Sequence, residues 1–266
     1  MSSVDPRRSL ELLRPTVDGL NADITALTPE QWEQPSSCHG WQVADLVAHV
    51  TRNGWSMLEY VRRNLSGDPS PPFGPGVNHV QEEIKASGAR RAAERQARET
   101  DEFIALCSSL TDEQLAAASS GHSSGPHPLA WACTQRLLEV AYHHWDLRAS
   151  FGDTGPLDQA LASWLLAFVF DPAGRPAMAL PSPGTNSPRD TFRLRSLTDG
   201  TAWRVAAGPD GLHVEAGPDG PAAAELAAHA GWLALAIYGR ADIHQPDFQW
   251  SGSAEAMSRF AAVFGD

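Results

Sequence analysis

The sequence has little of several features that would place it in other classes of protein. It contains no run of 18 or more apolar residues and no apolar segment near its start, so we expect neither a membrane-spanning helix nor a signal peptide. Basic residues are scarce, with 20 Lys and Arg against 32 Asp and Glu and a net charge of −12. The charge predicts no nucleic-acid partner, and the lack of a long apolar run predicts no membrane partner.

Cysteine and lysine are also scarce. The cysteines are an odd set, widely spaced, which does not fit a disulfide framework and indicates a reducing, cytoplasmic compartment. The one lysine is Lys85, so the basic residues are almost all arginine, and Ala, Gly and Pro are abundant. That composition is typical of a GC-rich bacterial genome.

The first half of the chain is patterned as helices. Apolar residues at spacings of three and four predict an amphipathic helix up to about residue 27. Pro15 is expected either to kink this helix or to mark the start of its regular part. Further helices are predicted over about 42–65, 77–110 and 129–150, and a shorter apolar one over 156–170. The fold class expected is α+β: a four-helix bundle over 1–172, a Pro- and Gly-rich linker over 173–190, and a small α+β domain over 191–266.

Within the small domain, the apolar pattern changes to period two. Short strands are predicted in TFRLRSL, TAWRV and LHVEA, with a further candidate in DFQWSG. The alanine-rich segment 221–238 is predicted to be a helix, and 254–264 a closing helix.

An internal repeat links the two halves of the bundle. ALTPEQWEQPSS and SLTDEQLAAASS each carry a capping box, and each precedes a tryptophan at the start of the next helix, Trp41 or Trp131. We interpret the first two and the last two long helices as two copies of one helical hairpin. Chance similarity between capping boxes is the alternative.

The repeat favours the interpretation of LEVAYHHWD as part of a metal site. Glu139 and His143 are four residues apart, so both lie on one helix face, whereas His144 is rotated by about 100°. His49 follows Trp41 at the same spacing as Glu139 follows Trp131. Two histidines and one carboxylate on facing helices would form a three-ligand set with open positions, typical of catalytic zinc, or of iron or nickel. A solvated Glu–His pair and a core histidine are the alternatives.

These stretches resemble a known family. CHGWQVADLVAHV and EVAYHHWDL are similar to two signatures of the DinB-like metalloproteins, and more narrowly of the mycothiol-dependent maleylpyruvate isomerase family. DTFRLRSLTDGTAWRV and LALAIYGRADI resemble that family's small C-terminal domain, so the resemblance covers nearly the whole chain. It implies a DinB-like bundle with His49, Glu139 and His143 as the ligands of a divalent metal.

The resemblance also implies an activity. The cosubstrate would be mycothiol, the low-molecular-weight thiol of actinobacteria, and a metal-bound thiolate would attack a small electrophile. Stable thiol transfer, thiol exchange in a biosynthetic pathway and cis–trans isomerisation all stay open, and no catalytic residue is assigned. The rival class is a non-catalytic DinB-like binding module. Either protein would be a monomer or a homodimer.

Three further residues are candidates for the functional site, and each also has a purely structural interpretation. Arg240 follows a predicted helix and could offer a guanidinium to a substrate carboxylate, or pair with the helix end. Asn53, one turn beyond His49, could contact substrate or thiol, or be an ordinary core or surface amide. Cys38 precedes a helix start, but we expect an inert thiol there.

Overall fold

The computed structural model describes residues 5–68, 70–73, 75–120, 122, 125–171, 191–208, 211–216 and 220–264. The chain divides into two compact units after Thr154. The predicted bundle ended at residue 172, later than this division, because helix α8 (Gln159–Val169) packs against α9 (Ala230–Ala236) of the second unit. The predicted linker, 173–190, lies outside the described residues.

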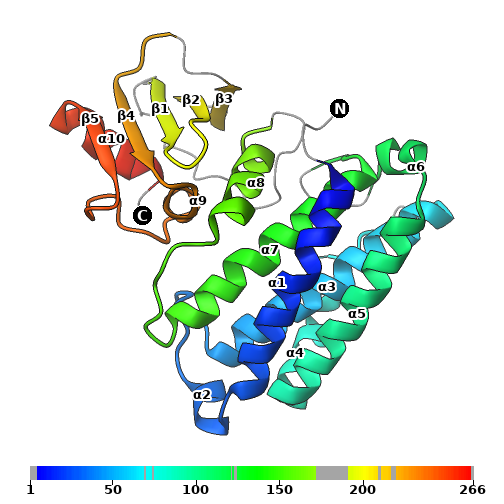
Figure 1. Cartoon of the computed structure of the whole chain (residues 1–266). Coiled ribbons are helices and arrows are strands. Elements are labelled where there is room, and N and C mark those ends of the chain that lie inside the picture. Colours follow the sequence, from blue (N-terminus) through cyan, green and yellow to red (C-terminus); the bar gives the residue numbers. More distant parts are fainter. Residues whose placement is uncertain are drawn as a thin grey trace. The chain divides into compact units, whose positions relative to one another are not determined.

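The first unit is a bundle of four long helices (Figure 1). These are α1 (Pro6–Ala26), α3 (Val43–Ser66), α5 (Ala89–Ser109) and α7 (Leu129–Ala149). Short elements connect them: α2 (Pro29–Glu33), the 3₁₀ turn η1 (Pro75–Val77), α4 (Asn78–Ser87) and α6 (Asp112–Ala116). Pro15 is accommodated inside α1, whose apolar stripe, including Leu13 and Val17, is fully buried.

The internal repeat is visible in the structure. Thr28 and Thr111 each cap a five-residue helix through a complete capping box. An antiparallel bridge follows each of these helices, Pro35 with Gln42 and Ala118 with Pro128, and leads into the next long helix. The two halves therefore repeat the same order of elements.

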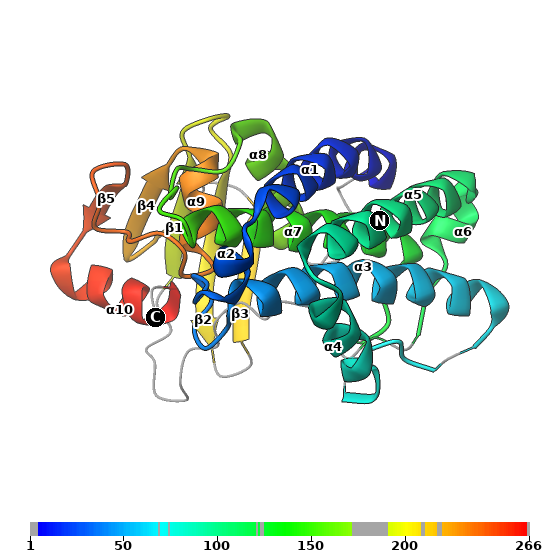
Figure 2. The ribbon, with the colours of Figure 1, turned by 90° about the horizontal axis from the view of Figure 1, so that it is seen from below.

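The predicted packing of the two halves as hairpins is wrong. α1 packs against α5 and α7, and α3 packs against α5 and α7, so α1 and α3 lie diagonally opposite each other, with the other two helices between them (Figure 2). This arrangement makes α3 and α7 direct neighbours, which is the relationship that the predicted site needs.

The predicted helix over 77–110 is two helices. Gly88 separates α4 from α5 with a φ of 82°, a left-handed conformation that a residue with a Cβ adopts only at a cost. The break allows α4 to pack against α3 independently of α5.

The second unit contains a five-stranded sheet of order β3-β2-β1-β4-β5. Its strands are β1 (Thr191–Ser196), β2 (Ala202–Gly208), β3 (Gly211–Ala216), β4 (Ala224–Ala228) and β5 (Gln249–Gly252). β1 and β4 are parallel, and the other neighbours are antiparallel. The helix α10 (Ala254–Phe264) contributes Phe260, whose ring contacts Phe192 of β1 and Trp250 of β5.

The predicted helix over 221–238 is wrong in its first half, because Ala224–Ala228 forms strand β4, and only Ala230–Ala236 is helical. None of the helices in the described part of the chain combines the length and the apolar character that a membrane crossing requires.

Candidate metal centre

The three predicted ligands come together between α3 and α7. Nε2 of His49 lies 3.6 Å from Oε2 of Glu139, and Nε2 of His143 lies 3.5 Å from the same oxygen. Glu139 and His143 are each only 7% exposed. Donor atoms about 2 Å from one tetrahedral ion are about 3.3 Å from each other, so these separations suit a single metal ion.

Two neighbouring side chains, Asp146 and Gln135, form hydrogen bonds with the atoms of His143 and Glu139 that do not face the other ligands. Nδ1 of His143 lies 2.9 Å from Oδ2 of Asp146, and because a carboxylate accepts hydrogen bonds, Nδ1 is the protonated nitrogen. In the neutral imidazole, Nε2 of His143 therefore carries the lone pair that a ligand needs. Gln135 donates from Nε2 to Oε1 of Glu139 at 3.2 Å, which leaves Oε2 directed toward the histidines. Such contacts are the usual support of metal-ligating side chains.

The charges of the three residues follow from these contacts. Burial raises the pKa of Glu139, but hydrogen bonds and charges from His143 and His49 outweigh it and hold the pKa well below its usual value. Burial lowers the pKa of His49 by more than its hydrogen bond to Glu139 raises it. An ionised carboxylate and a neutral imidazole are the forms in which these groups bind metals.

His143 differs from His49 in its partners. Burial lowers its pKa, but hydrogen bonds with Asp146, Cys38 and Glu139 outweigh burial and raise the pKa well above the usual value. Without a metal, the arrangement favours a protonated His143 paired with two carboxylates. A metal bound at Nε2 would replace that proton.

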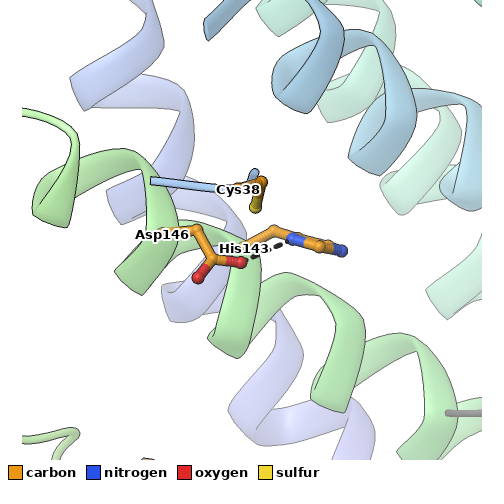
Figure 3. A group of neighbouring side chains, drawn as sticks. All are labelled: Cys38, His143 and Asp146. Carbon is orange, nitrogen blue, oxygen red and sulfur yellow. Dashed lines mark hydrogen bonds and ion pairs between the residues drawn. The ribbon is translucent and has the colours of Figure 1, made fainter. Parts of the chain in front are cut away.

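Cys38 and Trp41 are contacts that the sequence analysis missed. Cys38, Asp146 and His143 form a second cluster whose potential ligand atoms lie within 4.8 Å of one another (Figure 3). The ring of Trp41 lies 4.9 Å from that of His49 and 6.4 Å from that of His143, so it contacts both imidazoles. The sequence signal was available, since both residues belong to CHGWQVADLVAHV, but their distance from residue 143 along the chain concealed the contact.

The His49–Glu139–His143 cluster suits a metal better than the one containing Cys38. Asp146 is hydrogen-bonded to Nδ1 of His143, so this nitrogen is occupied by a proton on the side where Cys38 and Asp146 lie. On the other side of the ring, two imidazole nitrogens and a carboxylate oxygen face one another. Borderline nitrogen and oxygen ligands of this kind suit zinc, nickel or iron.

The remaining predicted residues lie in different environments. Nε2 of His144 lies 2.7 Å from Oδ2 of Asp23, so this histidine points away from Glu139, as its helical angle predicts. Asn53 is buried, and its Oδ1 accepts a hydrogen bond from Arg136. Arg240 follows α9 in the second unit, where its Nη1 lies 3.4 Å from the carbonyl oxygen of Tyr238. Contacts of Asn53 and Arg240 with a substrate stay predictions.

Fold and site together define a helical-bundle protein with a buried two-histidine, one-carboxylate centre. The sequence profile of the family described as "Mycothiol maleylpyruvate isomerase N-terminal domain" matches residues 13–148, just over half of the chain. The protein therefore belongs to this family, and the predicted resemblance is confirmed. A search of the curated proteins found no match.

Solved structures support the fold over almost the whole length. A crystal structure titled as the mycothiol-dependent maleylpyruvate isomerase superposes with a TM-score of 0.67 at 15% identity, covering 93% of each chain. A histidine-to-alanine mutant of that enzyme gives 0.66 at 14% identity, also covering 93% of each chain. YfiT from Bacillus subtilis, described as a probable metal-dependent hydrolase, matches at a TM-score of 0.48 and 15% identity, over 54% of this chain and 84% of its own. The predicted α+β class with a DinB-like bundle is confirmed.

Proposed function

We propose that this protein is a metal-dependent enzyme that uses mycothiol to modify a small electrophilic molecule, by transfer, exchange or isomerisation. The observation that carries the proposal is the convergence of His49 Nε2, His143 Nε2 and Glu139 Oε2 on one point, with the outer atoms of two of these residues held by Asp146 and Gln135. Family membership and the isomerase of the same fold support mycothiol as the thiol. The comparisons give no support to a non-catalytic binding module.

Under this proposal, each residue of the site has its own role. His49, Glu139 and His143 would hold the metal, and a divalent metal with an open position lowers the pKa of a thiol, so that a thiolate is available at neutral pH. Asp146 holds the proton at Nδ1 of His143 and so fixes the tautomer. Gln135 orients the carboxylate of Glu139, and Trp41 packs against the two imidazole rings.

A second candidate function uses the thiol of the protein itself. The ligand atoms of Cys38, His143 and Asp146 lie within 4.8 Å of one another, and a thiol beside an imidazole can be activated as a nucleophile. The same His143 cannot serve both functions in one state. Replacing Cys38 by Ser therefore separates them: it should leave metal content and mycothiol use intact under the first function and abolish activity under the second.

Metal content is the first test. Elemental analysis of the full chain should find about one equivalent of zinc, nickel or iron, and His49→Ala, Glu139→Ala and His143→Ala should each lose it, because two ligands are too few to retain the ion. The matched control is His144→Asn, which removes an imidazole from the same helix but one that contacts Asp23. Full occupancy in His49→Ala, or metal loss in His144→Asn, would contradict the assignment.

Thiol use is the second test. The metal-loaded protein should be stabilised against heat by mycothiol, and the stabilisation should vanish in Glu139→Ala, because the metal is what the thiol binds. Incubation with mycothiol and maleylpyruvate then distinguishes isomerisation, seen as a change in the acid alone, from transfer, seen as a stable thioether. Equal stabilisation of wild type and Glu139→Ala would show that mycothiol does not use this centre.

A further inference from the structure

Arg136 is a buried arginine of α7 that the proposed function leaves without a role. It is 1% exposed and lies three residues before Glu139, on the same side of the helix. Its Nη1 donates to the carbonyl oxygen of Val50 at 2.8 Å and to Oδ1 of Asn53 at 3.0 Å. Both acceptors belong to the turn of α3 that follows His49. The guanidinium therefore joins the turn that carries one predicted ligand to the turn that carries another.

The guanidinium reaches α3 through the space left by Gly54. A Cβ on this glycine would lie 2.8 Å from Nη2, 3.1 Å from Cζ and 3.5 Å from Nε of Arg136. In a regular helix the carbonyl of Val50 accepts a hydrogen bond from the amide of Gly54, and its second lone pair accommodates the bond from Arg136. This contact can form at only one position along the two helices.

The position of this contact matters because the predicted ligands come from two helices. Glu139 and His143 both lie on α7, so their separation follows from the geometry of one helix. His49 lies on α3, so the 3.6 Å between its Nε2 and Oε2 of Glu139 depends on how α3 packs against α7. A shift of one helix along the other would separate His49 from the two remaining ligands.

Stability alone does not explain an arginine at this place. Nη2 of Arg136 is buried without a hydrogen-bond partner, and within the described part of the chain the guanidinium forms no ion pair. Glu99, whose negative charge raises the pKa of Arg136, accepts its hydrogen bond from Arg95 at 2.7 Å. An apolar side chain of similar volume is often as stabilising as a buried charge, or more so. The best-supported role of such a buried polar group is to specify one register of packed helices.

We propose that Arg136 is a positioning residue that sets the register of α3 against α7 and so holds His49 at metal-binding distance from Glu139 and His143. The inference rests on the proposed function, because these three residues must bind a metal for their spacing to matter. Arg136 contacts neither the metal nor a substrate, and it acts through His49.

Binding of cobalt(II) to the metal-free full chain provides the test, by competition with a chelator and by the visible spectrum of the bound ion. Arg136→Met removes the donors but keeps a long side chain. It should bind cobalt about 10- to 100-fold more weakly than wild type, the usual effect of losing a residue that supports a metal ligand. The visible bands should also weaken, because water in place of a displaced His49 moves cobalt toward octahedral coordination.

The stability of the metal-free protein separates positioning from general support of the fold. Because an apolar replacement of a buried charge is often neutral or stabilising, Arg136→Met should resist urea at least as well as wild type. Arg136→Lys keeps the charge but lacks the planar fork, so its cobalt affinity should be intermediate. Asn53→Ala removes one of the two acceptors and leaves the arginine in place, so it should weaken cobalt binding by a smaller factor.

Two matched controls remove buried hydrogen bonds that join the same helices to other neighbours. Thr51 of α3 donates to Oε1 of Gln96 on α5 at 3.1 Å, and Thr134 of α7 lies 2.7 Å from Oγ of Ser9 on α1. Thr51→Val and Thr134→Val should therefore lower the free energy of unfolding but leave the affinity and the spectrum of cobalt unchanged.

Equal cobalt affinity in Arg136→Met and wild type would overturn the inference, as would an equal loss of affinity in Thr51→Val. A fall of both stability and cobalt affinity in Arg136→Met, with unchanged affinity in Asn53→Ala, would show that the arginine supports only the fold. If wild type binds no cobalt, the proposed function fails together with this inference. If wild type binds cobalt and Arg136→Met has no effect, this inference fails alone.

Discussion

At the scale of single residues, Gly54 of α3 lies against the guanidinium of Arg136 on α7. A Cβ on Gly54 would lie 2.8 Å from Nη2 of Arg136. Arg136 is fully buried and holds the carbonyl of Val50 and the amide of Asn53, so its guanidinium has little freedom to move aside. Burial lowers the pKa of Arg136 to about 10, which leaves it protonated at neutral pH. The absence of a side chain at position 54 therefore leaves room for the arginine opposite.

We predict that Gly54→Ala lowers the free energy of unfolding by about 1–3 kcal/mol, the usual effect of overpacking a core. The sign is informative, because Gly→Ala within a helix otherwise stabilises by about 1 kcal/mol. Urea denaturation measures the sign and the size of this change in the free energy of unfolding. In an Arg136→Met background the clash is removed, and the alanine should become neutral or stabilising. Stabilisation by Gly54→Ala in the wild type would refute the proposed contact.

The sequence was informative about residues whose relationship is local. Glu139 and His143 could be paired because four residues make one helical turn, and His49 could be added because the repeat aligned it with Glu139. The contact of Cys38 with His143 and that of Arg136 with Asn53 could not be predicted, because both depend on how distant helices pack. Local periodicity specifies a face of a helix but not what lies opposite.

At the scale of elements, the segment around β4 shows how packing overrides propensity. Ala224–Ala228 is rich in alanine, the best helix former, yet it forms a strand between β1 and β5. Its pairing with β1 supplies backbone hydrogen bonds, and Glu225 accepts hydrogen bonds from Arg195 at 2.7 Å and from Arg193 at 3.2 Å. Contacts between strands are not encoded in the composition of one strand, which is why the sequence predicted a helix here.

The Glu225 contacts predict a pH-dependent stability. Burial raises the pKa of Glu225, but the hydrogen bonds from Arg195 and Arg193 outweigh it, so the pKa in the folded state lies below the unfolded value of 4.5. The stabilisation is therefore complete above pH 4.5 and is lost as the pH falls through the folded pKa. We expect Glu225→Gln to cost about 1 kcal/mol at pH 7 and progressively less below pH 4.5.

Urea denaturation of wild type and Glu225→Gln across this pH range provides the measurement. Asp247→Asn, which removes an exposed carboxylate of the same unit, controls for net charge. If the difference in free energy of unfolding between wild type and Glu225→Gln grows as the pH falls, the sign of the pKa shift is contradicted.

At the scale of the whole molecule, the sequence predicted both units but not the position of their boundary. The change from helical to strand periodicity marks the sheet correctly, whereas α8 has an apolar helical pattern like those of the bundle. Only its contacts with α9 assign it to the second unit. A helix carries no local signal of which core it joins.

The role of the second unit in catalysis can be tested through Arg240. The prediction from the sequence is that Arg240→Ala keeps the metal but lowers kcat/KM by about one to two powers of ten, as expected for a lost charge-assisted contact with substrate. Steady-state kinetics with mycothiol and an organic acid measure it, with elemental analysis of the same samples. Unchanged kinetics would remove Arg240 from the reaction.

The diagonal placement of α1 and α3 has a consequence for how the protein folds during synthesis. The apolar stripe of α1 has its partners in α5, which begins 63 residues after α1 ends, and in α7, which begins 103 residues after it. Bundles of consecutive neighbours fold quickly because their contacts are local, whereas contacts this distant must wait for the chain that supplies them. We therefore expect α1 to leave the ribosome with its apolar face unburied until α5 emerges, and we expect the nascent chain to bind chaperones that shield such faces.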